Sequence, residues 1–328
     1  MTHPPGTVRK MLSRPEILLQ IAEIKVLTPR VSAYRLVSPH GERLPTWSAG
    51  AHLNFRLPSG RTRCYSLCGD PANKAEYWVA VQREENGEGG SLEVAETFAR
   101  GVVVPADPPR NGFPLAEDAR HHVLIAGGIG ITPVVAMIHH LKRNKASYFV
   151  HICARALKEV AFRDLIQAEV ALGRAKLHLD GNDPARRPDM GAMVGAAVDG
   201  THIYACGPAG FLKAFDRATE SWPRGQVHVE SFAPETKQTE GDRPFDVTII
   251  STGKTIQVPA GTTLLAALKA AGHDIATSCR QGICGSCMVA YLDGEPDHRD
   301  QALTDDERRE FLTVCCSRAR SASLTLDL

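Results

Sequence analysis

Three closely spaced cysteines near the end of the chain carry the strongest chemical signal in the sequence. Cys279, Cys284 and Cys287 lie within the run Ser-Cys-Arg-Gln-Gly-Ile-Cys-Gly-Ser-Cys-Met, and Cys315 follows further along. This C-x4-C-x2-C…C spacing is the ligand pattern of a plant-type 2Fe–2S cluster. Small residues between the thiols allow backbone N–H groups to reach the sulfurs. The pattern therefore predicts a cluster that accepts and releases one electron at a time.

A second candidate site lies in the sequence Arg-Cys-Tyr-Ser-Leu at residues 63–67. Arg63 offers a bidentate fork to a phosphate, and Tyr65, on the same face of a strand, can lie against a flat ring. Ser66 adds a hydroxyl group. The Gly-rich segment 87–91 could bind phosphate through its backbone amides. An exposed strand and a plain hairpin turn explain these two segments equally well without a ligand.

Two further loops have the composition of nucleotide-binding turns. The residues Gly-Gly-Ile-Gly at 127–130 follow a predicted strand and precede a predicted helix, where they let a pyrophosphate approach the helix N-terminus. Their spacing is not G-x-G-x-x-G, so the Rossmann fingerprint does not apply. Cys206-Gly-Pro208 ends another predicted strand, and open α/β sheets bind ligands beyond such carboxyl ends. A ligand-free turn and a buried small thiol are the alternatives at these loops.

The first elements that must position these groups are strands. Between residues 19 and 115, short strands separated by Gly and Pro fit a small antiparallel β-barrel. The predicted strands are Leu19–Leu27, Ser32–Ser38, His52–Leu57, Arg63–Leu67 and Tyr77–Arg83.

After Pro114, strands and helices alternate. This alternation is typical of an α/β domain in which helices cover both faces of a parallel sheet. The predicted strands are Val123–Ala126, Ser147–Cys153, Lys176–Leu179, Thr201–Ala205 and Val227–Ser231. The predicted helices are Thr132–Arg143, Lys158–Leu172 and Ala209–Trp222.

The remaining segments are a tail, a linker and a third folded unit. Residues 1–18 bear prolines and are expected to form a loose tail, and the polar residues 233–244 have the composition of a linker. The third unit is predicted to be an α+β ferredoxin domain of the β-grasp type. Its expected elements are the hairpin strands Phe245–Ser251 and Thr255–Val258, the helix Thr263–Ala271 and a last strand Leu324–Leu328.

The bulk composition narrows the class of protein. A chain of 328 residues with 43% hydrophobic residues is long enough for two or three domains with ordinary cores. Its formal net charge of +1 gives no indication of a nucleic-acid or membrane partner. The start of the chain lacks the basic and apolar regions of a signal peptide, so the other cysteines are expected to be reduced in a cytoplasmic enzyme.

Taken in order, these motifs resemble the phthalate dioxygenase reductase family, and reductases of vanillate O-demethylase and carnitine monooxygenase look similar. The resemblance covers about residues 19–328 and includes the specific segment Gly294–Asp300. It implies a multidomain chain: a tail at 1–18, an FMN-binding β-barrel at 19–115, an NADH-binding α/β domain at 116–232, a linker at 233–244 and a 2Fe–2S ferredoxin domain at 245–328. FMN, and not FAD, is implied by this family alone.

The resemblance also implies roles for individual residues. FMN would contact Arg63, Cys64, Tyr65, Ser66, Val81, Gln82, Gly89, Gly90 and Ser91. NADH would be held by Gly127, Gly128, Gly130, Thr132, Cys206, Gly207 and Pro208, with Phe232 stacked where nicotinamide meets the flavin. Ser66, Thr132, Cys206 and Phe232 would be the catalytic residues. The position of Arg155 leaves NADPH open as a second donor.

The fourth cluster ligand has two candidates, because Cys316 directly follows Cys315. In relatives, one residue usually separates the ligand from the serine that corresponds to Ser317. This register favours Cys315 and leaves Cys316 as the alternative.

The expected reaction is the transfer of electrons from NADH to a separate acceptor. Hydride carries two electrons and the cluster accepts one, so a flavin between them is required. The resemblance implies that the acceptor is a terminal oxygenase of the Rieske non-haem iron type. The reductase is expected to be a monomer. A reductase for a diiron hydroxylase or a cytochrome P450 is the alternative enzyme, and a redox sensor is the alternative without turnover.

Overall fold

The computed structural model of the protein describes residues 16–232 and 241–328. Its first domain is a curled antiparallel sheet. Its strands run in the order β4-β3-β6-β1-β2-β5, with β7 paired to β3, and an isolated bridge between Leu67 and Val79 joins the two ends. The predicted barrel is confirmed. The strands are β1 (Ile17–Thr28), β2 (Val31–Val37), β3 (Ala51–Arg56), β4 (Thr62–Ser66), β5 (Glu76–Gln82), β6 (Val103–Ala106) and β7 (Arg110–Asn111).

Alternation of side chains along these strands builds the barrel core. Leu19, Leu36, Leu53, Tyr77 and Val79 are fully buried inside it, because successive residues of a strand point to opposite faces. The sequence analysis missed the short strands β6 and β7 and one helix: the segment predicted as a Gly-rich turn opens helix α1 (Gly90–Thr97). The predicted tail lies outside the described residues except for its last three, and strand β1 starts among these.

The second domain is the predicted parallel sheet, with its five strands in the order β10-β9-β8-β11-β12. The strands are β8 (His121–Gly127), β9 (Tyr148–Ala154), β10 (Ala175–Leu179), β11 (Thr201–Gly207) and β12 (Val227–Ser231). The helices are α2 (Ile131–Arg143), α3 (Arg163–Ala171), α4 (Met190–Val194) and α5 (Ala209–Ala218), with short 3-10 turns at Gly128–Gly130, Leu157–Glu159, Pro184–Arg186 and Arg224–Gln226.

Two predicted helices of this domain are shorter than expected. Helix α3 begins at Arg163 and not at Lys158, because Phe162 has a left-handed backbone with φ of 53° that interrupts a helix. Helix α5 ends at Ala218 and not at Trp222. There the hydroxyl of Thr219 lies 3.0 Å from the carbonyl of Phe215 and 3.3 Å from that of Asp216, two carbonyls of the last turn.

The third domain is a mixed five-stranded sheet in the order β14-β13-β17-β15-β16, packed on one helix. Its elements are β13 (Phe245–Ile249), β14 (Thr255–Val258), α6 (Leu264–Ala270), β15 (Met288–Asp297), α7 (Asp305–Arg308), β16 (Phe311–Thr313) and β17 (Arg318–Leu326). The long strand β15 was not predicted. Most of the predicted linker lies outside the described residues, and its described end is tied to this domain, since Asp242 pairs with Arg299 at 2.7 Å.

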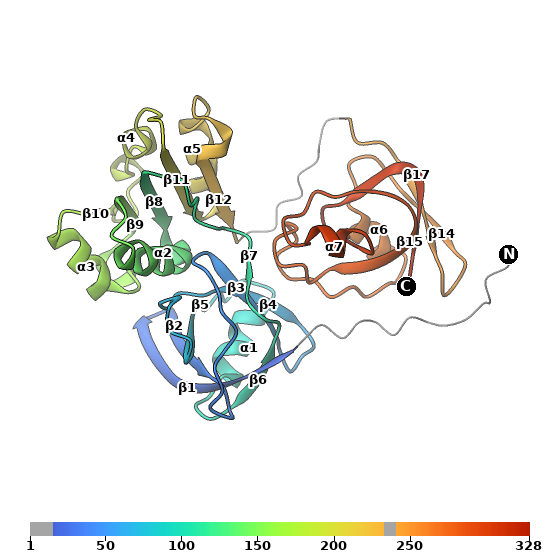
Figure 1. Cartoon of the computed structure of the whole chain (residues 1–328), viewed down its shortest axis with the longest axis horizontal. Coiled ribbons are helices and arrows are strands. Elements are labelled where there is room, and N and C mark those ends of the chain that lie inside the picture. The colour runs from blue at the N-terminus through green and yellow to red at the C-terminus, as the bar shows by residue number, and fades with distance from the viewer. Residues whose placement is uncertain (1–15, 233–240) are drawn as a thin grey trace.

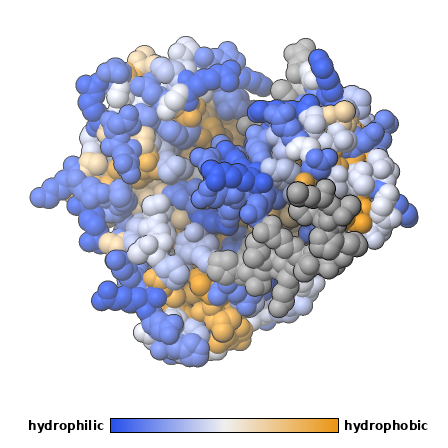
Figure 2. All heavy atoms as spheres, turned by 45° about the vertical axis from the view of Figure 1, so that its right-hand side comes forward, coloured by the Kyte–Doolittle hydropathy of each residue, from blue (hydrophilic) through white to orange (hydrophobic). Residues whose placement is uncertain are grey.

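Figure 1 shows the barrel below the parallel sheet, with the third domain beside both and strand β7 near it. The face seen in Figure 2 is mostly hydrophilic, with apolar side chains in small groups. Within residues 16–232 and 241–328, none of the helices has the length and apolar character needed to cross a bilayer.

Candidate functional site

The predicted cluster loop lies between α6 and β15 and is shaped by backbone N–H groups that point at sulfur. Cys284 donates its N–H to Sγ of Cys279 at 3.3 Å, and Cys279 returns a bond to Sγ of Cys284 at 3.4 Å. Gln281 adds a third donor to Sγ of Cys279 at 3.4 Å. The loop can turn this tightly because Gly282 and Gly285 have φ of 75° and 68°. Such donors stabilise negative charge on the sulfurs of a bound cluster.

The four predicted ligands lie in two pairs. Cys279 contacts Cys284, and Cys315 contacts Cys287. A hydrogen bond from the Cys279 thiol is the largest cause that lowers the pKa of Cys284, and the Ser286 hydroxyl acts in the same direction. Within the described part of the chain, no three potential ligands converge on a single metal ion. A 2Fe–2S cluster has four thiolates on two irons, so two pairs are a donor set that fits it.

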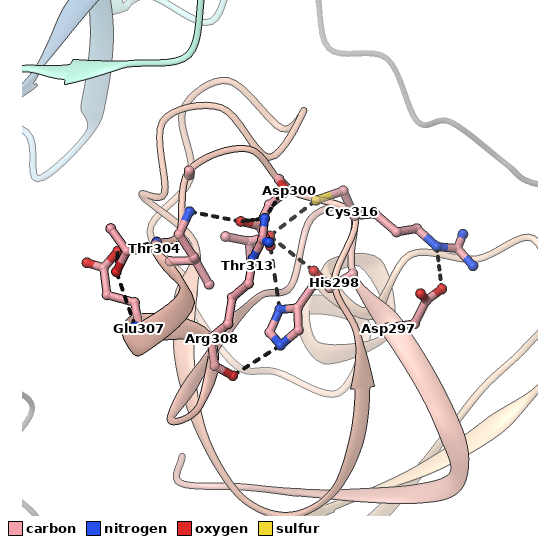
Figure 3. Close-up of polar contacts among 12 residues, drawn as sticks. Asp297, His298, Asp300, Thr304, Glu307, Arg308, Thr313 and Cys316 are labelled. Carbon is pink, nitrogen blue, oxygen red and sulfur yellow. Dashed lines mark hydrogen bonds and ion pairs between the residues drawn. The ribbon is translucent and has the colours of Figure 1, made fainter.

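Cys315 and Cys316 lie in different surroundings. The pKa of Cys315 is raised far above its ordinary value, first by the hydrogen bond with Cys287, and only 2% of the residue is exposed. Cys316 lies 3.2 Å from the hydroxyl of Thr313, in the polar network drawn in Figure 3. A Cβ added to Gly282 would lie 2.5 Å from Sγ of Cys316, so Cys316 packs behind the loop. Cys315 is therefore the better placed candidate.

The predicted phosphate site joins strand β4 to the start of α1. Arg63 lies so close to Gly90 that a Cβ there would be 2.1 Å from its Nε. Gly89 has φ of 82°, and no side chain caps the helix. A guanidinium beside the free N–H groups of a helix N-terminus is a donor set that fits a phosphate. The Nη2 of Arg63 lies 3.3 Å from a carboxylate oxygen of Glu88, a group that would compete with the phosphate.

The other predicted flavin residues line two neighbouring strands and one helix. Tyr65 packs against Phe55 with ring centroids 6.1 Å apart, and burial raises the pKa of its phenol. Cys64 points to the opposite face of β4, where burial raises the pKa of its thiol. Val81 and Gln82 end strand β5, and the Ser91 hydroxyl accepts the N–H of Glu84 at 3.0 Å.

The predicted nucleotide loops meet at the carboxyl ends of β8 and β11. Gly127 ends β8, Gly128 has φ of 58°, and a Cβ added to Gly130 would lie 2.2 Å from the carbonyl oxygen of Cys206. The two loops are therefore in direct backbone contact. The hydroxyl of Thr132 donates to the carbonyl of Ile129 at 3.1 Å, within the first turn of α2.

On the β11 side, the loop ends at the start of a helix. Pro208 stands at the N-cap of α5 and Gly207 packs against the ring of Phe211. This opening at the carboxyl edge of a parallel sheet is where α/β domains bind nucleotides.

Glu230 is a functional candidate that the sequence analysis missed. It is 4% exposed and lies between the two domains: the Ser66 hydroxyl hydrogen-bonds its carboxyl, and Sγ of Cys206 lies 3.9 Å from Oε2. Burial raises the pKa of Glu230 to about 8. Its position in the sequence could have identified it, because Glu230 directly precedes Ser231 and Phe232, and Phe232 was expected to contact the nicotinamide. Phe232 itself is 43% exposed, so its ring is open to a ligand.

Comparison with known proteins gives one matching family model and several full-length relatives. Residues 247–320 match the 2Fe-2S iron-sulfur cluster binding domain. The reductase subunit of tert-butanol monooxygenase / tert-amyl alcohol desaturase from Aquincola tertiaricarbonis is 39% identical, over 94% of this chain and 95% of that protein.

Two solved structures are also similar. Phthalate dioxygenase reductase, described as a modular structure for electron transfer from pyridine nucleotides to [2Fe-2S], is 36% identical with a TM-score of 0.70 and covers 95% of this chain and 98% of its own. An intact type IV self-sufficient cytochrome P450 monooxygenase is 34% identical with a TM-score of 0.78; it covers this whole chain, which matches 43% of that protein.

These matches agree with the fold and with the motifs on which the resemblance was based. The chain belongs to the phthalate dioxygenase reductase family and is an electron-transfer oxidoreductase.

Proposed function

We propose that this chain passes electrons from NADH through FMN and a 2Fe–2S cluster to a terminal oxygenase of the Rieske type. The observation that supports the order of transfer is the position of strand β4. Ser66 at its end contacts Glu230 of the parallel-sheet domain, and the neighbouring strand β3 contacts Cys284 of the cluster loop through Asn54. A flavin on β4 would thus lie between the hydride donor and the one-electron acceptor.

The residues divide into three groups with different tasks. Arg63, with the N–H groups that begin α1, would bind the FMN phosphate, and Tyr65 and Ser66 would orient its ring. The backbone of the Gly127–Gly130 loop would bind the pyrophosphate of NADH, and Phe232 would contact the ring where nicotinamide enters. Cys279, Cys284, Cys287 and Cys315 would hold the cluster. FMN, when bound, converts a two-electron donor into a source of single electrons.

Glu230 is suited to hold a proton beside the nicotinamide and flavin. Its raised pKa means that the carboxyl is largely protonated at neutral pH. It can therefore both donate and accept a hydrogen bond without placing a negative charge in a buried position. Ser66 and Cys206 fix its position.

A spectroscopic titration tests this proposal. The purified protein is expected to release FMN, identified by mass, and to show the visible absorption of a 2Fe–2S cluster. Anaerobic NADH should bleach the flavin first and the cluster second, faster than NADPH does. Release of FAD, or reduction of neither group by NADH, would contradict the proposal.

A cytochrome P450 is the second candidate for the acceptor, supported by the similarity to the self-sufficient P450. The two are separated by mixing the reduced protein with a purified Rieske oxygenase or a purified P450. The expected result is rapid reoxidation by the Rieske oxygenase alone.

A further inference from the structure

Two barrel residues outside the cofactor motifs, Asn54 and Arg110, make polar contacts with the ferredoxin domain. Asn54 of strand β3 is 1% exposed, and its Nδ2 donates to the carbonyl of Cys284 at 2.8 Å. The same amide lies 3.3 Å from a carboxylate oxygen of Asp107 on the barrel side. Cys284 is a proposed cluster ligand. The bond therefore ties the peptide unit of that ligand directly to a barrel strand.

Two more contacts flank this bond. Arg110 of β7 lies 2.9 Å from a carboxylate oxygen of Glu307 and donates to the carbonyl of Ala302 at 2.8 Å. Gly112 leaves room for the side chain of Ile283, because a Cβ there would lie 2.5 Å from its Cγ2. Ile283 directly precedes Cys284, so the contacts surround the cluster loop.

On the ferredoxin side, a network of polar contacts around the buried carboxylate of Asp300 connects helix α7 to the cluster loop. Figure 3 shows Arg308, His298 and Asp300 pointing toward one another beside Glu307 and Thr304. Arg308 donates to the carbonyl of Asp300 at 2.7 Å, and the next residue, Gln301, donates its N–H to the carbonyl of Gly282 in the loop at 2.9 Å. The segment Asp300–Gln301 therefore connects helix α7 to the cluster loop by hydrogen bonds on both sides.

A third barrel residue, Glu88, also contacts the cluster loop, since its carboxylate lies 2.6 Å from the guanidinium of Arg280. Next to the interface lies a cleft of about 400 Å³ whose lining includes Pro109, Ile283 and Thr304. Both ring nitrogens of His52 and the Oδ1 of Asn54 are buried without a hydrogen-bond partner among the described residues. Buried polar groups without a partner cost free energy, so burial stabilises this interface only weakly. The hydrogen bonds that are formed therefore determine how the two domains are positioned.

We propose that Asn54 and Arg110 are positioning residues that hold the cluster loop against the flavin barrel for electron transfer between the two. The proposal rests on the function proposed above. Asn54 pairs in register with Cys64 of β4, the strand to which the flavin is assigned. The loop is thus docked one strand away from the flavin residues, and a loss of either contact would change the distance between the two redox groups.

The test uses the holoprotein and the variant Asn54→Ala. Anaerobic mixing with NADH in a stopped-flow instrument is expected to give flavin reduction at the wild-type rate and cluster reduction slowed by about tenfold or more, as for other small misplacements of reacting groups. Hydrogen–deuterium exchange gives a readout without turnover: peptides that cover residues 51–56 and 279–287 should exchange faster in the variant.

Two further variants keep the result interpretable. Glu307→Gln removes the charge that faces Arg110 but can still serve in the capping box of α7 with Thr304, so the helix is retained. It should slow the same step. Glu295→Gln is the matched control, since Glu295 is 68% exposed and its partner Arg320 lies in the same domain. It should leave both steps unchanged.

Wild-type cluster reduction in both Asn54→Ala and Glu307→Gln would overturn the proposal, as would equal slowing in the control. Failure of NADH to reduce the flavin of the wild type would instead contradict the proposed function. In that case the exchange measurement alone decides whether these contacts dock the loop.

Discussion

At the scale of single residues, the choice between two adjacent cysteines has a direct test. Cys315 contacts Cys287, whereas Cys316 contacts Thr313 behind the loop. We expect Cys315→Ser to lose most of its iron and the visible absorption of the cluster, because one iron loses a thiolate. Cys316→Ser should keep both. Iron and sulfide analysis of the two purified variants measures this, and the reverse pattern would make Cys316 the ligand.

Glu230 makes a second residue-scale prediction, because its pKa differs between the folded and unfolded states. An unfolded glutamate ionises near pH 4.3, whereas burial keeps Glu230 protonated up to about pH 8. The folded state therefore binds more protons in this window, and stability falls as pH rises through it. We expect Glu230→Gln to gain on the order of 3 kcal/mol relative to wild type between pH 5 and pH 8.

Denaturant unfolding of both proteins at several pH values measures this difference, and the comparison cancels other groups that titrate. A constant difference across the range would show that Glu230 is ionised in the folded protein.

At the scale of elements, the start of helix α1 requires a residue without a side chain at position 90. A Cβ at Gly90 would meet the guanidinium of Arg63, so Gly90→Ala must displace it. We expect the affinity for FMN to fall by about tenfold, the equivalent of one lost charge-assisted hydrogen bond. Flavin fluorescence on dilution measures the release.

Gly210→Ala is the control for this change. Gly210 lies in the first turn of α5 with no heavy atom within 4 Å of an added Cβ, so alanine should keep FMN bound and stabilise the helix by about 0.5–1 kcal/mol. Equal loss of FMN in both variants would show that Arg63 does not depend on the space at Gly90.

At the scale of the whole molecule, the three domains should differ in their response to acid. Burial lowers the pKa of His122, His151 and His228 to about 4, and all three lie on the parallel sheet. Unfolded histidines titrate near pH 6.5, so the folded domain binds fewer protons below that value. The stability that these three histidines contribute is complete above pH 6.5 and is lost as pH falls toward 4. Glu230 on β12 acts in the opposite direction, but it is one group against three.

We therefore expect the parallel-sheet domain to open first in acid. Hydrogen exchange at pH 7 and pH 5 should accelerate more in peptides from β8, β9 and β12 than in peptides from β13 and β17, after correction for the intrinsic rate. Uniform acceleration would contradict the prediction. The ring of His228 stacks on Tyr204 with centroids 4.4 Å apart, so His228→Phe replaces it with another flat ring that does not titrate and should reduce the effect.

The sequence by itself determined the fold class, the order of the domains and most strands. Side-chain periodicity and turn residues are local signals, and they placed β12 at its observed bounds, Val227–Ser231, and β3 within one residue of its own. Local reasoning failed at helix α1, where a Gly-rich segment looked like a turn, and at the start of α3, where the left-handed backbone of Phe162 delays the helix. The C-x4-C-x2-C pattern, too, lies within one loop and needed no tertiary information.

Tertiary structure decided which residues outside the motifs meet them. Glu230 lies between Ser66 and Cys206, and Asn54 reaches Cys284 across 230 positions of chain. Tertiary structure also distinguished Cys315 from Cys316. Adjacent side chains leave the backbone in different directions, and only packing decides which of the two meets Cys287. Such contacts depend on how the domains pack together, and neither spacing nor composition carries that information.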